Sequence, residues 1–166
     1  MAAGPGYNAP MVEDFTPDAI ETGLWVGRAP RAPEEFAHLR DLGVQDVLTL
    51  QTEDEARACG ILPQLAFRIA MAHDLGLHRV EIPDLSPAAL RSRTLQAASL
   101  LKELRERGRG VYVHCAIGLS RSPTVVAAYL VLTRGLTSDE ACAFVQALHA
   151  SVPDRDAVRA VARAKL

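Results

Sequence analysis

Two nearly uncharged runs lie close together in the second half of the chain. Gly110–His114 (GVYVH) is short and rich in β-branched and aromatic residues, which predicts a strand covered on both faces. Thr124–Leu132 is apolar on all sides of a helical wheel, which predicts a buried helix. A fully buried strand that leads directly into a buried helix is typical of a mainly parallel sheet between layers of helices.

The rest of the chain continues this alternation. Its strand-like runs are Leu24–Gly27, Gln45–Leu50 and Leu77–Ile82. Its helical runs are Pro33–Leu42, Leu62–Asp74, Pro87–Gly108 (after an N-cap at Ser86), Thr137–Ala150 (with a capping box) and Pro153–Ala164. Thr52–Cys59 is expected to be a polar connection. We therefore predict an α/β fold of three layers, a central, mostly parallel sheet flanked by helices on both faces.

The domain organisation is predicted to be simple. Residues Met1–Asp14 are rich in Gly, Ala and Pro and lack periodicity, so we expect a poorly ordered tail. Residues 15–166 contain neither an internal repeat nor a low-complexity linker, which predicts one domain. A chain of 166 residues buries ~70% of its unfolded surface, enough for a hydrophobic core without disulfides or metals.

The charge and apolar patterns exclude two classes of partner. The net charge of −2, from 18 basic and 20 acidic residues, argues against a nucleic-acid protein held by a general basic field. The longest strongly apolar run, Val125–Leu132, is far short of the ~20 residues needed to span a bilayer. We expect a monomer that binds neither nucleic acid nor membrane.

The cysteines indicate a reducing compartment. Cys59, Cys115 and Cys142 are an odd count without C-x-x-C spacing, which disfavours a disulfide framework and a structural zinc site. The first residues lack the pattern of a secretory signal, so we expect a cytoplasmic protein with free thiols. His38, His73, His78 and His149 lack ligand spacing, and no metal or other cofactor is expected.

The segment between the buried strand and the buried helix carries the chemistry. It reads His114-Cys115-Ala116-Ile117-Gly118-Leu119-Ser120-Arg121-Ser122-Pro123. A loop in this place directs backbone N–H groups and the positive end of a helix toward one point, which forms an anion site. Arg121 adds a guanidinium that matches two phosphate oxygens. These groups would also favour the thiolate form of Cys115 and so combine a nucleophile with a phosphate site.

The spacing H-C-x5-R-S resembles the signature of the protein tyrosine phosphatase superfamily, specifically its dual-specificity branch. The resemblance implies a phosphomonoesterase that acts through a phosphocysteine intermediate on phosphotyrosine and on phosphoserine or phosphothreonine in proteins. The implied catalytic residues are the nucleophile Cys115, the general acid and base Asp84, Arg121, and Ser122, which assists the sulfur. The implied phosphate-binding residues are Ala116, Ile117, Gly118, Leu119, Ser120 and Arg121, and His114 is expected to orient Cys115.

Structural roles are the alternative for each of these residues. Cys115 could be a buried structural cysteine, Asp84 a turn residue among prolines, and Ser122 a helix cap. The loop lacks the Gly-Lys-Ser/Thr of a Walker A nucleotide site. A catalytically idle module that only binds phosphoproteins is the rival from another functional class.

A weaker resemblance to plant starch phosphatases and laforin suggests phosphoglucan as an alternative substrate. It rests on Leu24–Gly27, Val47–Asp54, Glu81–Arg91 and Asp154–Ala162. Aromatic residues expected of that group are replaced here by Ala58, Cys59 and Leu85, and aromatics are only 5% of the chain. Because sugar rings bind by stacking on exposed aromatics, the glucan alternative ranks second. Cys59 is also a candidate to trap an oxidised Cys115 as a disulfide.

Overall fold

The computed structural model describes residues 14–58 and 61–165. Its described part contains a five-stranded sheet in the order β1-β2-β5-β3-β4, in which β1 runs antiparallel to β2 and the other neighbours are parallel. The strands are β1 (Asp18–Glu21), β2 (Leu24–Gly27), β3 (Asp46–Thr49), β4 (Gly76–Arg79) and β5 (Val111–His114). The mostly parallel sheet is as predicted. The expected tail, apart from Asp14, and Cys59 lie outside the described residues.

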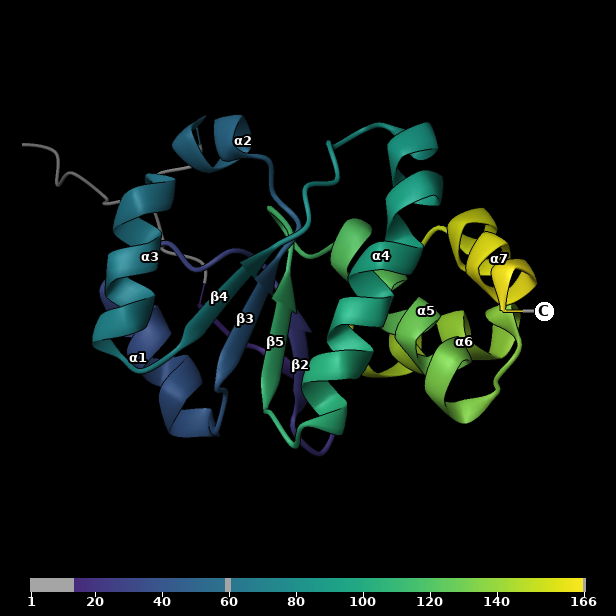
Figure 1. Cartoon of the computed structure of the whole chain (residues 1–166), viewed down its shortest axis with the longest axis horizontal. Coiled ribbons are helices and arrows are strands. Elements are labelled where there is room, and N and C mark those ends of the chain that lie inside the picture. The colour runs from purple at the N-terminus through teal and green to yellow at the C-terminus, as the bar shows by residue number, and fades with distance from the viewer. Residues whose placement is uncertain (1–13, 59–60, 166) are drawn as a thin grey trace, which may run out of the picture.

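Helices cover both faces of the sheet, so the predicted three-layer α/β architecture is confirmed (Figure 1). On one side lie α1 (Pro33–Leu42) and α3 (Pro63–Ala72), with the short α2 (Glu53–Ala58) beyond the end of the sheet. On the other side lie α4 (Pro87–Glu106), α5 (Arg121–Arg134), α6 (Ser138–Leu148) and α7 (Arg155–Ala164). The predicted N-cap at Ser86 and the capping box at Thr137 are both present.

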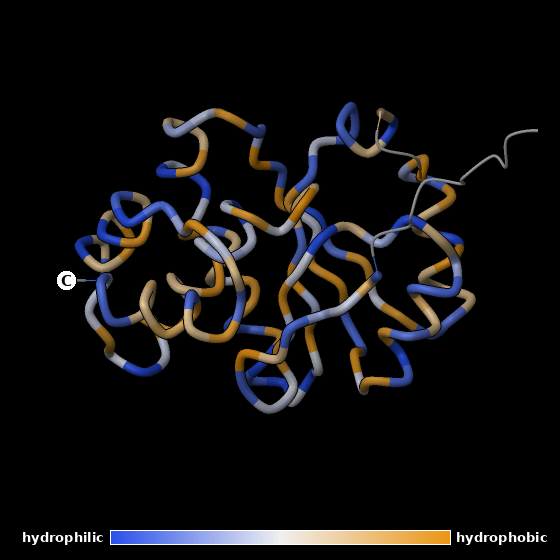
Figure 2. Tube along the Cα trace, turned by 180° about the vertical axis from the view of Figure 1, so that it is seen from behind, coloured by the Kyte–Doolittle hydropathy of each residue, from blue (hydrophilic) through white to orange (hydrophobic). Residues whose placement is uncertain are grey.

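The alternation of side chains along the strands divides the core into two parts. Val47 and Tyr112 point toward α1 and α3, whereas their neighbours Leu48 and Val113 point toward the four C-terminal helices. Every residue of β3 and β5 is buried, which explains why neither strand alternates between apolar and polar residues. Figure 2 shows this apolar interior as orange segments in the central strands.

Several element boundaries differ from those expected. The run Leu77–Ile82 forms a strand only up to Arg79, and α5 begins at Arg121 rather than at Thr124. Two short elements, β1 and α2, were not predicted. Ile20 is the only buried residue of β1 and Ala56 the only one of α2, so neither element has a recognisable apolar period.

Three further observations concern features considered in the sequence analysis. Cys142 is fully buried on α6, as expected of a core residue, and burial raises the pKa of its thiol. None of the described helices is both long and apolar enough for a bilayer crossing. Among residues 14–58 and 61–165, His, Cys, Asp and Glu side chains form no group of three suited to a metal ion.

Candidate active site

The loop from Cys115 to Ser120 is held from its outer side by four hydrogen bonds to its carbonyl oxygens. His114 Nδ1 contacts the carbonyl of Cys115 at 2.9 Å, and the amide of Ala29 donates to that of Ala116 at 3.0 Å. His149 Nε2 contacts the carbonyl of Gly118 at 2.6 Å, and the Val152 amide donates to that of Leu119 at 2.8 Å.

These outward carbonyls determine where the loop amides point. In a trans peptide the N–H lies opposite the C=O, so the N–H groups that follow the four carbonyls turn toward the inside of the loop. They belong to Ala116, Ile117, Leu119 and Ser120. Together with the N-terminus of α5, which begins at Arg121, they form the anion cradle predicted from the sequence.

Gly118 allows this curvature. Its φ is +76°, a region in which a side chain is strained, and a Cβ would lie 2.6 Å from the backbone carbon of Gly27 at the end of β2. The loop therefore packs directly against the neighbouring strand. No other residue type fits there without movement of the backbone.

Cys115 and Ser122 meet at the floor of the loop. Cys115 Sγ lies 3.3 Å from Ser122 Oγ, and both residues are buried. Ser122 Oγ is also 3.5 Å from the carbonyl of Gly27. A hydroxyl at this distance can donate to a sulfur that carries negative charge, which is the position that the resemblance required of Ser122.

Arg121 is buried in the same site and makes three contacts through Nη1. It donates to both carboxylate oxygens of Glu55, at 3.0 and 2.7 Å, and to the carbonyl of Ile82 at 2.8 Å. The side chain is only 5% exposed, so a paired carboxylate is needed to offset the loss of hydration of its charge. Glu55 thus fixes the guanidinium in one orientation.

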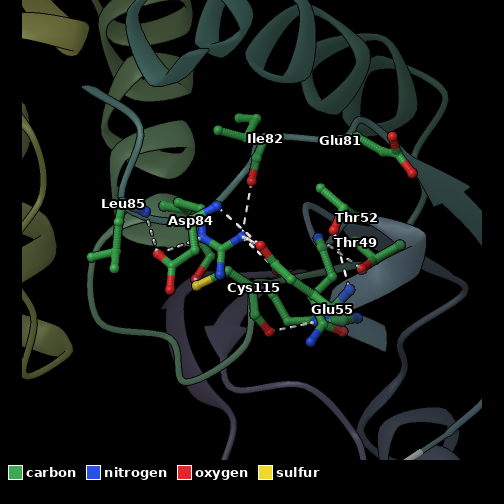
Figure 3. A network of polar contacts seen from close by, with 12 residues as sticks. Thr49, Thr52, Glu55, Glu81, Ile82, Asp84, Leu85 and Cys115 are labelled. Atoms are coloured by element: carbon green, nitrogen blue, oxygen red, sulfur yellow. Dashed lines mark hydrogen bonds and ion pairs between the residues drawn. The ribbon is translucent and has the colours of Figure 1, made fainter. Parts of the chain in front are cut away.

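Asp84 joins the same group of charges from the loop before α4. Its Oδ1 lies 3.4 Å from Arg121 Nε and accepts a hydrogen bond from the amide of Leu85 at 3.0 Å. Its own amide donates to Glu55 Oε1 at 2.9 Å. Figure 3 shows Asp84, Glu55 and Cys115 converging from three separate segments. The structure therefore brings together the four residues expected to be catalytic.

Glu55 is the residue of this site that the sequence analysis missed. It lies on α2, within the segment that we expected to be only a polar connection. The sequence contains one signal for it, the acidic run Glu53–Glu55 that follows β3. In the structure β3 and β5 are parallel neighbours, with Thr49 paired with His114. The residues that follow the two strands therefore meet at one edge of the sheet, and an acidic run after β3 faces the loop after β5.

His114 is buried beneath the loop and remains uncharged. Burial lowers the pKa of His114 to about 4, and the positive charges of Arg79 and Arg121 act in the same direction. The carbonyl of Cys115 can only accept, so the ring proton lies on Nδ1. The ring also stacks on Tyr112, with centroids 5.9 Å apart. His114 holds the backbone of Cys115, as expected, and is unsuited to act as a base.

The low pKa of His114 predicts acid sensitivity. The unfolded chain binds a proton near the ordinary value of 6.5, whereas the folded chain does so only near 4. The unfolded state therefore binds more protons between these values, and the free energy of unfolding falls as the pH falls. We expect a loss of about 2 kcal/mol from about pH 7 to about pH 4.5 from this residue. Urea denaturation of the wild type and His114→Asn measures it, and parallel pH dependences in the two proteins would contradict it.

Comparison with known proteins yields a family match and sequence relatives that include two kinds of phosphatase. Residues 24–159 match the family model described as dual specificity phosphatase, catalytic domain. The amyloplastic phosphoglucan phosphatase DSP4 of Castanea sativa is 32% identical over 145 residues, which are 86% of this chain and 39% of that protein. Dual specificity protein phosphatase 12 of Mus musculus is 32% identical over 124 residues, which are 74% of this chain and 33% of that protein. The chain thus spans less than half the length of these relatives.

A solved structure shares the fold. The crystal structure of PTPMT1 superposes with a TM-score of 0.73 at 21% identity and covers 89% of this chain and 92% of that one. Both resemblances noted in the sequence, to dual-specificity phosphatases and to plant starch phosphatases, are thereby confirmed.

Proposed function

This chain belongs to the dual specificity phosphatase family, and from that premise we propose that it hydrolyses phosphomonoesters of proteins through a phosphocysteine intermediate. The observation that carries the proposal is the convergence on one loop of a buried thiol, a guanidinium held by Glu55, and an aspartate within 3.4 Å of that guanidinium. The buried thiol must stay reduced to act, so we propose a reducing, cytoplasmic location.

The first step is transfer of the phosphoryl group to sulfur. The thiolate of Cys115 attacks phosphorus, and the bond between phosphorus and the ester oxygen breaks. Asp84, as a carboxylic acid, gives its proton to the departing oxygen, which leaves as an alcohol or phenol. Arg121 and the inward amides of the loop bind the nonbridging phosphoryl oxygens and stabilise the charge that they carry in the transition state.

The second step releases phosphate. Asp84, now a carboxylate, accepts a proton from water as the water oxygen attacks phosphorus, and the sulfur–phosphorus bond breaks. The electron pair returns to Cys115, and the hydroxyl of Ser122, 3.3 Å from the sulfur, stabilises the thiolate that forms. The products are inorganic phosphate and the original enzyme, with Asp84 protonated again.

The surface around the loop favours protein substrates over glucans. Four aliphatic side chains surround it: Leu85, Ile117, Leu119 and Val152, which are 95, 66, 45 and 63% exposed. Leu85 lines the same pocket as Ser120 and Arg121, and the Val152 amide is bonded to Leu119. An aliphatic rim suits a phenol ring or an apolar peptide side chain, whereas sugar rings bind best on aromatic faces. Glucan hydrolysis, the activity in the name of the Castanea relative, remains the second candidate.

Initial rates on both substrate classes test this ranking. We expect release of phosphate from phosphotyrosyl and phosphothreonyl peptides, in EDTA, with kcat/KM at least about tenfold above that for phosphorylated amylopectin. The amylopectin is assayed at matched phosphate concentration. Faster release from amylopectin would reverse the ranking, and binding of phosphopeptides without any turnover would favour the idle binding module.

Replacing the proposed acid tests its role. We expect Asp84→Asn to lower kcat about 100-fold on a phenyl phosphate, whose leaving group needs a proton, and far less on an aryl phosphate with an acidic phenol. The pH profile should also lose its alkaline limb on phenyl phosphate. Glu81→Gln is the matched control, at a half-buried residue at the start of the same loop. Its carboxylate accepts a hydrogen bond from the Glu53 amide at 3.0 Å, which the amide oxygen of Gln can also accept, so the variant should retain kcat. Equal losses on the two substrates would show that Asp84 is not the acid.

A further inference from the structure

His149, to which the sequence analysis gave no role, contacts the loop from Cys115 to Ser120 from outside. We call this loop the phosphate loop. It follows α6 directly, and its Nε2 lies 2.6 Å from the carbonyl oxygen of Gly118. Its Nδ1 lies 2.6 Å from a carboxylate oxygen of Asp18 on β1. The side chain is 11% exposed, so it is nearly enclosed between the loop and the edge strand.

The two partners of His149 determine its protonation. A backbone carbonyl and a carboxylate only accept hydrogen bonds, and a neutral imidazole carries a single N–H. A neutral ring would therefore point a lone pair at one of the two oxygens from 2.6 Å. Only the imidazolium donates to both. We propose that His149, as a cation paired with Asp18, is a positioning residue that holds the Gly118–Leu119 peptide of the phosphate loop.

The charges around the ring favour the imidazolium form of His149. Besides Asp18, its pocket contains Asp14 and Arg28, together with Tyr112 of β5 and Ile117 of the loop. The charge of Arg28 is balanced by Glu35, whose Oε1 lies 2.8 Å from its Nη2. The negative end of the α6 dipole, at which His149 lies, and a thiolate at Cys115 would also favour a cation.

Holding this peptide has a direct consequence for the site. With the Gly118 carbonyl fixed outward, the amide of Leu119 turns inward as a phosphate ligand. The next peptide is held from the same segment, because the Val152 amide donates to Leu119 O at 2.8 Å. Ser151 in turn donates to the carbonyl of His149 at 2.8 Å. The role of His149 rests on the proposed function, but its charge does not, and the two can be tested separately.

Nitrogen NMR of the intact chain tests the charge. At neutral pH we expect both ring nitrogens of His149 to carry a hydrogen-bonded proton, one directed at Asp18 and one at the Gly118 carbonyl. In Asp18→Asn, which keeps an acceptor but lacks the charge, we expect only one ring nitrogen to carry a proton. A wild-type ring with a single proton, or a ring unaffected by Asp18→Asn, would overturn the proposal whether or not the chain is active.

Kinetics test the positioning role. His149→Ala should lower kcat about tenfold or more, and His149→Gln, which can donate to Gly118 without charge, should recover part of the loss. Asp18→Asn, which keeps an acceptor for the ring but removes the charge, should lower kcat less than His149→Ala does. His38→Gln, at an exposed histidine on α1, is the control and should keep wild-type kcat.

The outcomes separate the two proposals. A wild-type chain without any phosphatase activity would refute the proposed function and leave the NMR result standing. An active chain in which His149→Ala keeps wild-type kcat would overturn the positioning role alone.

Discussion

Replacement of Cys115 by serine will abolish turnover and leave phosphoester binding intact. The serine hydroxyl fits the same buried position beside Ser122 but is not ionised near neutral pH, so the nucleophile is lost. The backbone hydrogen bonds that shape the loop remain, and so does Arg121. We expect kcat to fall at least about 10⁴-fold. Single-turnover assays measure the loss, and isothermal titration with a phosphopeptide measures binding.

The matched control for this substitution is Cys142→Ser. Cys142 is also a fully buried thiol, but it lies on α6, in the core that the C-terminal helices share. A buried hydroxyl there costs stability, which a melting curve reports, without touching the phosphate loop. Retention of more than about a hundredth of wild-type kcat in Cys115→Ser would contradict a covalent mechanism through this sulfur.

Replacement of Arg121 by lysine has the second largest expected effect. The guanidinium contacts Glu55 and the carbonyl of Ile82 through one nitrogen, and its shape allows it to bind two phosphoryl oxygens as well. The single ammonium group of lysine cannot contact Glu55 and bind two phosphoryl oxygens at the same time. We expect kcat/KM to fall about 10³-fold, with weaker inhibition by inorganic phosphate.

Two variants separate the role of Arg121 from general loss of structure. Arg93→Lys is the matched control, because Arg93 donates to the carbonyl of Glu81 at 2.8 Å and so supports the same region outside the phosphate loop. Glu55→Gln keeps Arg121 but weakens its anchor, and should cost about tenfold. An Arg121→Lys protein that retains more than about a tenth of wild-type kcat/KM would contradict the bidentate role.

The sequence was informative where one local pattern carried the whole signal. The buried strand and helix around the phosphate loop predicted both the fold class and the residues Cys115 and Arg121, since these lie within one short segment. The roles of Ser122 and Asp84 were found only through the resemblance to a family, because a serine at a helix start and an aspartate between prolines are by themselves an ordinary cap and an ordinary turn residue.

Glu55 and His149 could not be placed at the site from any single local pattern. Each acts on the phosphate loop from another part of the chain, Glu55 from 66 residues before Arg121 and His149 from 31 residues after Gly118. Their helices bring them there only because β3 lies beside β5 and α6 ends next to β1. Neither contact corresponds to a periodic pattern of residues in the sequence.

The amino-acid sequence by itself determined the layer architecture and the chemistry of the loop, because apolar periodicity and the order of residues in a tight turn are local properties. Only the tertiary structure decided how that chemistry is held in place. The orientation of Arg121 and the charge of His149 depend on which acceptors lie within hydrogen-bond distance. That distance is set by the packing of strands and helices remote in sequence.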